Sequence, residues 1–124
     1  MKKLEEYRNG ISKYVIQSMR DYLNFDEEYI EGDSIGYTLK DIEKCGAILN
    51  EYIDDLSESN KDEKLILKSV KKVVLALNKL NQNCEYELIE TDQREDLSQF
   101  INETAIVAGL SEFENDITEE WREW

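Results

Sequence analysis

Two groups of acidic residues have a spacing that suits the binding of a metal ion. Glu27, Glu28 and Glu31 form the first group, and Glu51 and Asp54 form the second. Carboxylates three or four positions apart lie on one face of a helix, and hard cations such as Mg²⁺ bind several oxygen ligands. The pattern is therefore compatible with a divalent-cation site between two helices.

These two groups resemble the EExxE and ExxD motifs of the MazG-like, all-α nucleoside triphosphate pyrophosphohydrolases. The resemblance implies two antiparallel helices on which the five acids would hold magnesium. The sequence departs from the family at Gly32, which directly follows the first group where the family continues its helix, and no basic cluster follows to bind the triphosphate. We keep this enzyme as the alternative hypothesis.

The other residue types exclude much of the remaining catalytic chemistry. The 124 residues contain no histidine, which removes Ser-His and Cys-His nucleophile pairs and His-ligated zinc sites. The two cysteines, Cys45 and Cys84, form no CxxC motif, and Cys45 falls on an apolar helical stripe, where we expect it to be buried. We therefore expect no enzyme activity, no cofactor and no metal site.

Apolar residues recur at the three- to four-residue spacing of amphipathic helices in four segments. These segments run over residues 4–22, 38–57, 61–82 and 93–108. Polar residues that favour helix starts precede the last three segments, and we predict N-caps at Thr38, at Asn60 and at Thr91 or Asp92. Gly109 is the predicted glycine at the end of the last helix.

The pattern predicts an all-α fold, an antiparallel bundle of four main helices with a short C-terminal helix, in a single domain over residues 1–124. We expect the short helix within residues 111–124, with Trp121 and Trp124 packed against the bundle or forming an exposed patch for dimerisation. The sequence has neither the apolar region of a signal peptide nor an apolar run long enough to span a membrane, so we expect a cytoplasmic protein. We expect it to be a monomer or a homodimer.

Charge gives the main indication of a partner. Acids outnumber bases 29 to 15, for a net charge of −14. This balance argues against direct binding of nucleic acid or of an anionic membrane surface. Residues 25–60 carry two bases and eleven acids, whereas residues 61–82 carry six bases and two acids. An acidic surface of this kind fits a basic protein partner, because opposite charges raise the rate of association.

The strongest candidate for such a surface is the acidic and aromatic stretch that precedes the second predicted helix, together with the acidic face of that helix. Tyrosine supplies rigid contact area, and carboxylates pair with lysine or arginine of a partner. The predicted partner-binding residues are Asp26, Glu27, Glu28, Tyr29, Glu31, Asp33, Tyr37, Asp54 and Asp55.

The C-terminal third carries a second resemblance. The residues concerned are 88–95, 100–103, 108–110 and the closing Asp-Ile-Thr-Glu-Glu-Trp-Arg-Glu-Trp at 116–124. They resemble small acidic bacterial immunity proteins of toxin–immunity systems, and the acidic helical immunity proteins of colicin-type nucleases are a more distant comparison. The resemblance implies a non-enzymatic protein that neutralises a basic, nuclease-like toxin encoded next to it.

A third hypothesis is a nucleic-acid mimic, an acidic inhibitor that occupies a DNA-binding site. It requires carboxylates spaced like phosphates along one edge of the molecule. We rank it last, because two of the four predicted helices are basic.

Overall fold

The computed structural model describes residues 4–11, 15–21, 37–110 and 116–124. Its named helices are α1 (Leu4–Ile11), α3 (Leu39–Glu58), α4 (Glu63–Asn83) and α5 (Thr91–Ala108), and residues 15–21 are helical as well. None of these described residues forms a strand, so the prediction of an all-α fold is confirmed. The first predicted helix is helical over residues 4–11 and 15–21, and residues 12–14 lie outside the described chain.

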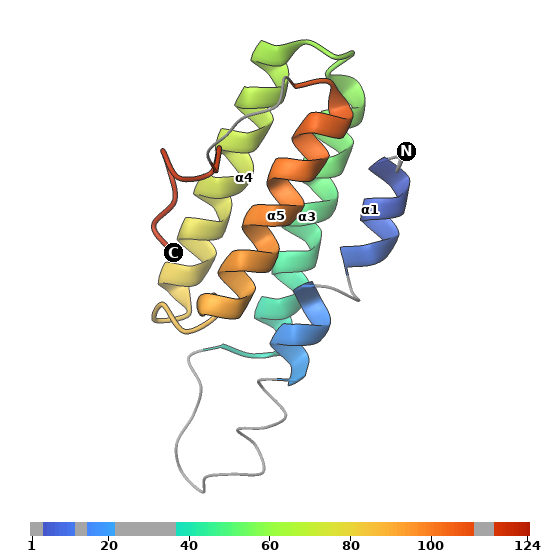
Figure 1. Ribbon diagram of the computed structural model, residues 1–124. Helices are drawn as coiled ribbons and strands as arrows, with labels where there is room; N and C mark the ends of the chain where they lie inside the picture. The colour runs from blue at the N-terminus through green and yellow to red at the C-terminus, as the bar shows by residue number, and fades with distance from the viewer. Residues whose placement is uncertain (1–3, 12–14, 22–36, 111–115) are drawn as a thin grey trace, which may run out of the picture.

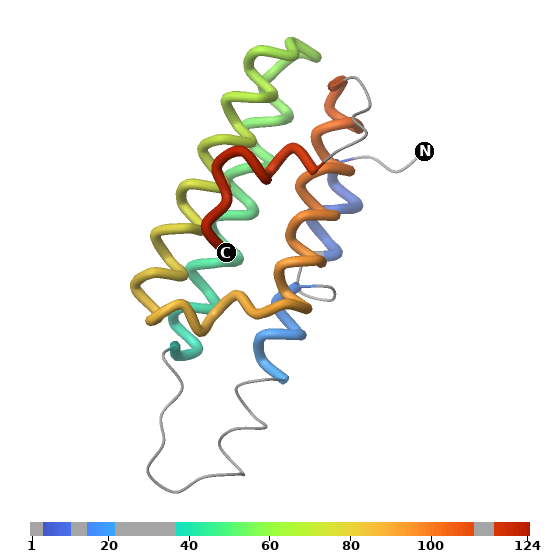
Figure 2. Tube along the Cα trace, turned by 60° about the vertical axis from the view of Figure 1, so that its left-hand side comes forward, coloured from blue at the N-terminus to red at the C-terminus, as the bar shows by residue number. Residues whose placement is uncertain are grey.

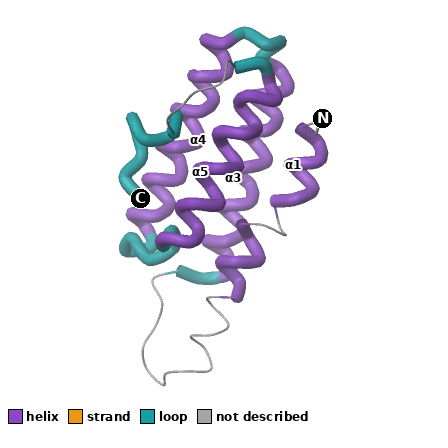
Figure 3. Tube along the Cα trace, in the orientation of Figure 1, coloured by secondary structure: helices purple, strands orange, loops and turns teal. Residues whose placement is uncertain are grey.

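The helices lie side by side (Figures 1 and 2). Their buried apolar side chains form one core. In Figure 1 the chain rises through α3, descends through α4 and rises again through α5. α3 packs most extensively against α4, while α1 contacts both α3 and α5. Short connections join α3 to α4 and α4 to α5 (Figure 3). Most of the buried apolar residues come from α3, α4, α5 and residues 15–21, so these elements form most of the core. The segments beside the helices add Tyr37, Cys84, Leu88, Ile89 and Leu110.

The predicted cap of α3 is confirmed, and the predicted cap of α4 is wrong. The Asp41 carboxylate accepts a hydrogen bond from the backbone N–H of Thr38 at 2.9 Å, as a capping pair at the start of α3 requires. α4 begins after Asp62, whose carboxylate accepts the N–H of Lys64 at 2.9 Å. Asn60, the predicted cap, has a φ of 53° and lies in the left-handed turn between the two helices. Asparagine tolerates this conformation, which explains its place in the turn.

α5 begins two residues earlier than the periodicity predicts. Glu90 is its N-cap, and the side-chain oxygen of Gln93 accepts the N–H of Glu90 at 3.1 Å. The predicted caps Thr91 and Asp92 are therefore the first residues of the helix. The buried Gln93 amide also donates to the Ser18 hydroxyl at 3.0 Å, so a tertiary contact with residues 15–21 favours this start.

Gly109 ends α5 as predicted, and the packing there requires glycine. Its φ is +128°, which side chains with a Cβ rarely adopt. A Cβ at this position would also lie 3.0 Å from the Cβ of Lys61, in the turn between α3 and α4. Glycine thus allows the end of α5 to approach that turn closely.

Among the described residues, Tyr52 is the largest fully buried side chain, and it joins α3 to α5. Its hydroxyl donates to the carbonyl oxygen of Ile101 at 3.0 Å and accepts from the Thr104 hydroxyl at 3.0 Å. Its ring meets the ring of Phe100 edge-on, with 6.2 Å between centroids. The polar end of a central aromatic residue is therefore satisfied within the core.

Residues 116–124 form turns and no helix, which corrects the predicted short C-terminal helix; residues 111–115 lie outside the described chain. Asn78 of α4 holds this tail by its side chain. The amide nitrogen donates to the carbonyl oxygen of Trp121 at 2.7 Å, and the amide oxygen accepts the N–H of Glu123 at 3.0 Å. The tail closes its own turns, for example with the N–H of Arg122 donating to the carbonyl oxygen of Thr118 at 2.9 Å, and the bonds to α4 fix those turns against the bundle.

The start of the tail is held by Asn102 of α5. Its amide nitrogen donates to the Asp116 carboxylate at 2.9 Å, and its oxygen accepts the N–H of Ile117 at 2.9 Å. Burial by itself raises the pKa of Asp116, but hydrogen bonds from Thr118 and Asn102 and the charge of Arg122 outweigh it and lower the pKa. The ionised carboxylate therefore stabilises the tail.

Candidate functional site

Six of the nine predicted partner-binding residues lie outside the described chain: Asp26, Glu27, Glu28, Tyr29, Glu31 and Asp33. Tyr37 is described and lies in the core, with 4% of its surface exposed. Its hydroxyl donates to the carbonyl oxygen of Met19 at 3.4 Å. Tyr37 would have to leave the core to contact a partner.

Asp54 and Asp55 lie on α3, and each already pairs with a cationic side chain. Asp54 accepts from the Arg8 guanidinium of α1 at 2.6 Å, and this bond is the main reason that the pKa of Arg8 is raised. Asp55 and Glu51 both contact the Lys72 ammonium of α4, at 3.1 and 3.0 Å. A basic partner would therefore compete with groups of the chain itself at both positions.

Glu51 and Asp54, the second of the two acidic groups with metal-binding spacing, pair with basic residues on different helices. Glu51 pairs with Lys72 on α4, whereas Asp54 pairs with Arg8 on α1. The first acidic group falls outside the described residues. Among the residues that are described, no three cysteine, aspartate or glutamate side chains are grouped so as to hold a metal ion.

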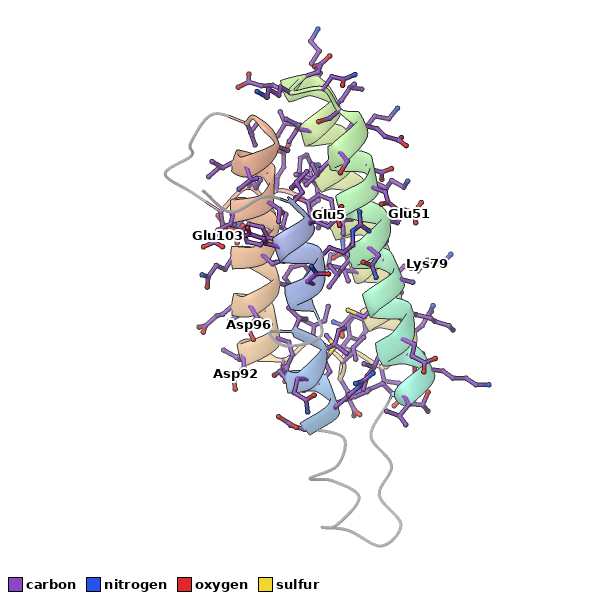
Figure 4. All side chains as sticks on the ribbon, turned by 90° about the vertical axis from the view of Figure 1, so that its right-hand side faces the viewer. Glu5, Glu51, Lys79, Asp92, Asp96 and Glu103 are labelled. Atoms are coloured by element: carbon purple, nitrogen blue, oxygen red, sulfur yellow. The ribbon has the colours of Figure 1, made fainter. Side chains whose placement is uncertain are left out.

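The structure reveals an acidic row on α5 that the sequence analysis missed. We define the acidic row as Asp92, Glu95, Asp96 and Glu103, which share one face of the helix by their spacing. Figure 4 shows Asp92, Asp96 and Glu103 on the same side of the molecule. The acidic composition of this region was a signal, but its spacing marks Asp92 only as a possible helix cap.

The carboxylates of the acidic row crowd one another at its N-terminal end. Burial, followed by the charges of Asp92 and Glu95, raises the pKa of Asp96. None of these three acids makes an ion pair with another described residue. A cation supplied from outside would relieve this repulsion.

The C-terminal end of the acidic row borders an aromatic side chain of α1. The Glu103 carboxylate accepts from the Tyr7 hydroxyl at 3.1 Å and from the Gln99 amide at 3.1 Å. Burial, with the charge of Glu103, raises the pKa of Tyr7, so the phenol stays protonated. The Tyr7 ring meets Phe100 edge-on at 6.1 Å, which places a half-buried aromatic next to the acids.

We expect Asp96→Asn to raise the melting temperature at pH 7. The folded-state pKa of Asp96 is raised above its unfolded value, so its ionised form opposes folding at neutral pH. The gain should vanish as the pH falls below both pKa values, at about pH 3, because the wild-type carboxyl is then protonated in both states. Thermal unfolding at the two pH values measures this, with the exposed Glu119→Gln as control; a variant that melts below wild type at pH 7 would contradict it.

α4 carries the opposite charge on a separate side of the molecule. We define the basic stripe as Lys68, Lys71, Lys72 and Lys79, all of which are exposed. Lys79 points away from the side that carries the labelled acids of α5 (Figure 4). Of the four lysines, only Lys72 forms an ion pair within the described chain. The partly exposed Leu75 lies in the same stripe.

These features define an all-α protein whose surface charge is segregated, with an acidic row on α5 and a basic stripe on α4. Comparisons of the chain with protein families, with characterised proteins and with solved structures gave no match. Within the described part of the chain, no helix combines the length and apolar character needed to cross a bilayer.

Proposed function

We propose that this protein is a non-enzymatic immunity protein that binds and neutralises a basic protein toxin. In this proposal the helices form an antiparallel bundle that serves as a scaffold. The acidic surface of the bundle covers a nuclease-like toxin that is encoded next to it and acts in the bacterial cytoplasm. The proposal draws on the acidic character of the chain and on its resemblance to immunity proteins.

The observation that carries the proposal is the crowding of Asp92, Glu95 and Asp96. Burial, followed by the charges of Asp92 and Glu95, raises the pKa of Asp96. None of the three carboxylates has a cationic partner among the described residues. Lysine or arginine side chains of a toxin would stabilise the ionised form of these carboxylates on binding. Charges at the edge of an interface act mainly on the rate of encounter, and such acceleration suits the rapid capture of a toxin.

The segregation of charge supports the same function. Four of the chain's fifteen bases lie together in the basic stripe of α4. The remaining surface is consequently more acidic than an even distribution of the net charge of −14 would make it. In the proposal, the predicted residues between Asp26 and Asp33 also contact the toxin, and Asp54 and Asp55 contribute when a partner displaces Arg8 and Lys72.

Co-purification with the protein encoded next to this chain tests the proposal. We expect a stable complex whose association rate falls with increasing salt. The triple variant Asp92→Asn, Glu95→Gln, Asp96→Asn should bind about 10- to 100-fold more weakly, because three carboxylates that receive the toxin's cations are lost. Binding kinetics on an immobilised partner measure both effects.

A second triple variant, Glu43→Gln, Glu119→Gln, Glu120→Gln, is the matched control. It removes the same amount of charge from exposed positions outside the acidic row. We expect it to bind within about threefold of wild type, since distant exposed charges are largely screened. The proposal fails if the neighbouring protein is acidic and does not bind, or if both triples weaken binding equally.

A further inference from the structure

We propose that copies of this chain associate with one another, the basic stripe of one copy binding the acidic row of the next. The stripe lies on α4 and the row on α5. This contact involves no toxin, so it stands or falls independently of the function proposed above.

The two surfaces share the same spacing. The lysines at 68, 71, 72 and 79 and the acids at 92, 95, 96 and 103 both follow the pattern i, i+3, i+4, i+11. At a rise of about 1.5 Å per residue, each set spans roughly 16 Å along its helix. When α4 of one copy runs parallel to α5 of another, each of the four lysines lies at the same height along the helix axis as one of the four acids. When the helices run antiparallel, only the first and last residues of the two sets lie at matching heights. The charges therefore favour the parallel arrangement.

The two surfaces cannot pair within one molecule. Lys79 points to one side of the molecule, and Asp92, Asp96 and Glu103 lie on the opposite side (Figure 4). α4 and α5 of the same chain also run in opposite directions in Figure 1. Each copy can therefore offer its stripe to one neighbour and its row to another, which makes the contact heterologous.

Most of the charged groups of the two surfaces are available for such a contact. The exceptions are Lys72, which pairs with two acids of α3, and Glu103, which accepts two hydrogen bonds within its own chain. Lys68, Lys71 and Lys79 are exposed, and none of them forms an ion pair within the described chain. Asp92 and Glu95 are exposed and equally unpaired. The contact would also cover Leu75, whose side chain is 45% exposed in a single copy. Charge complementarity and the covering of an apolar side chain both favour a second copy as the occupant.

Each copy carries a net charge of −14, so repulsion between copies weakens their association. At about 0.15 M salt the Debye length is roughly 8 Å, so repulsion between distant charges is screened more than attraction between groups in contact. Exposed ion pairs contribute little each, so we expect weak association that appears at hundreds of micromolar, with Kd of about 0.1–1 mM.

Sedimentation velocity of the purified full chain tests the proposal. The average sedimentation coefficient of wild type should rise with concentration. A stripe variant, Lys68→Gln, Lys71→Gln, Lys79→Gln, should stay monomeric because it lacks the basic surface. The row variant that carries Asp92→Asn, Glu95→Gln and Asp96→Asn should stay monomeric for the opposite reason.

An equal mixture of the two variants is the decisive sample. The stripe variant keeps an intact acidic row and the row variant keeps an intact basic stripe, so the mixture should form 1:1 complexes that neither variant forms alone. A general effect of net charge predicts no such recovery. Circular dichroism of each variant verifies that it is folded.

Variants with equal changes of charge elsewhere serve as controls. The triple variant Lys40→Gln, Lys44→Gln, Lys61→Gln matches the stripe variant in charge. The triple variant Glu43→Gln, Glu119→Gln, Glu120→Gln matches the row variant. Both control variants should associate as wild type does. The proposal is overturned if wild type stays monomeric at every concentration, which would leave the stripe to a different, acidic partner. It is also overturned if the mixture does not associate or if the controls lose association.

Discussion

Tyr52→Ala should lower the free energy of unfolding by about 3–5 kcal/mol, the largest stability effect we expect from a single substitution. The side chain is 1% exposed and lies between α3 and α5. Its loss removes the edge-on contact with Phe100 and both hydrogen bonds to α5, and it leaves a cavity that the surrounding helices fill only in part. Urea unfolding followed by circular dichroism measures the change.

Two other tyrosine substitutions separate the causes of this loss. Tyr52→Phe should cost about 1 kcal/mol, because the ring is kept and the Thr104 hydroxyl still has the carbonyl oxygen of Phe100 at 2.6 Å. Tyr86→Ala should change stability by less than about 0.5 kcal/mol, because Tyr86 is 57% exposed. A Tyr52→Ala variant as stable as Tyr86→Ala would show that Tyr52 does not join α3 to α5.

Asn78→Ala should detach the C-terminal tail from α4 and lower stability by about 1–3 kcal/mol. The substitution leaves the carbonyl oxygen of Trp121 and the N–H of Glu123 without their partner on α4. The chain has two tryptophans, Trp121 and Trp124, and both lie in this tail. Their fluorescence therefore reports the position of the tail, and we expect emission to shift to longer wavelength as the indole rings meet water.

Asn50→Ala is the control for this prediction. Asn50 is an exposed residue of α3, and its side chain makes no hydrogen bond to the tail. We expect its emission spectrum to match that of wild type and its stability to change by less than about 0.5 kcal/mol. An unshifted spectrum for Asn78→Ala would contradict the role given to Asn78.

Both proposed contacts use the acidic row of α5, so the toxin and a second copy of the chain should compete for it. A basic toxin bound at Asp92, Glu95 and Asp96 would occupy the surface that a second copy needs. We therefore expect the toxin to bind single copies and to dissociate any assembled ones. Association between copies would then keep the acidic row covered only until a partner with higher affinity arrives.

The sequence predicts the three long helices well, because their signal is local. Apolar residues at three- to four-residue spacing gave segments 38–57, 61–82 and 93–108, which agree with α3, α4 and α5 to within two residues at each end. The burial of Cys45 is confirmed for the same reason, since it belongs to the inward stripe of α3. Burial raises the pKa of its thiol to about 12, which keeps it protonated.

The errors have two causes. The cap of α4 is a local error, because Asn60 adopts a left-handed conformation in the turn and Asp62 caps the helix instead. The error in the tail comes from residues distant in sequence. A helical pattern was expected in the tail, but Asn78 and Asn102 bond its backbone from two other helices. Sequence spacing within a segment does not reveal such contacts.

Composition and periodicity by themselves determined that this protein is all-α, acidic and built on amphipathic helices. Only the tertiary structure decided which charges meet. Arg8 pairs with Asp54, and Lys72 contacts both Glu51 and Asp55, whereas the first turns of the acidic row have no ion pair with any residue that the structure describes. The physical reason is range. A helix is fixed by residues within a turn or two of one another, whereas the pairing of surface charges depends on how the packed core orients each helix toward its neighbours.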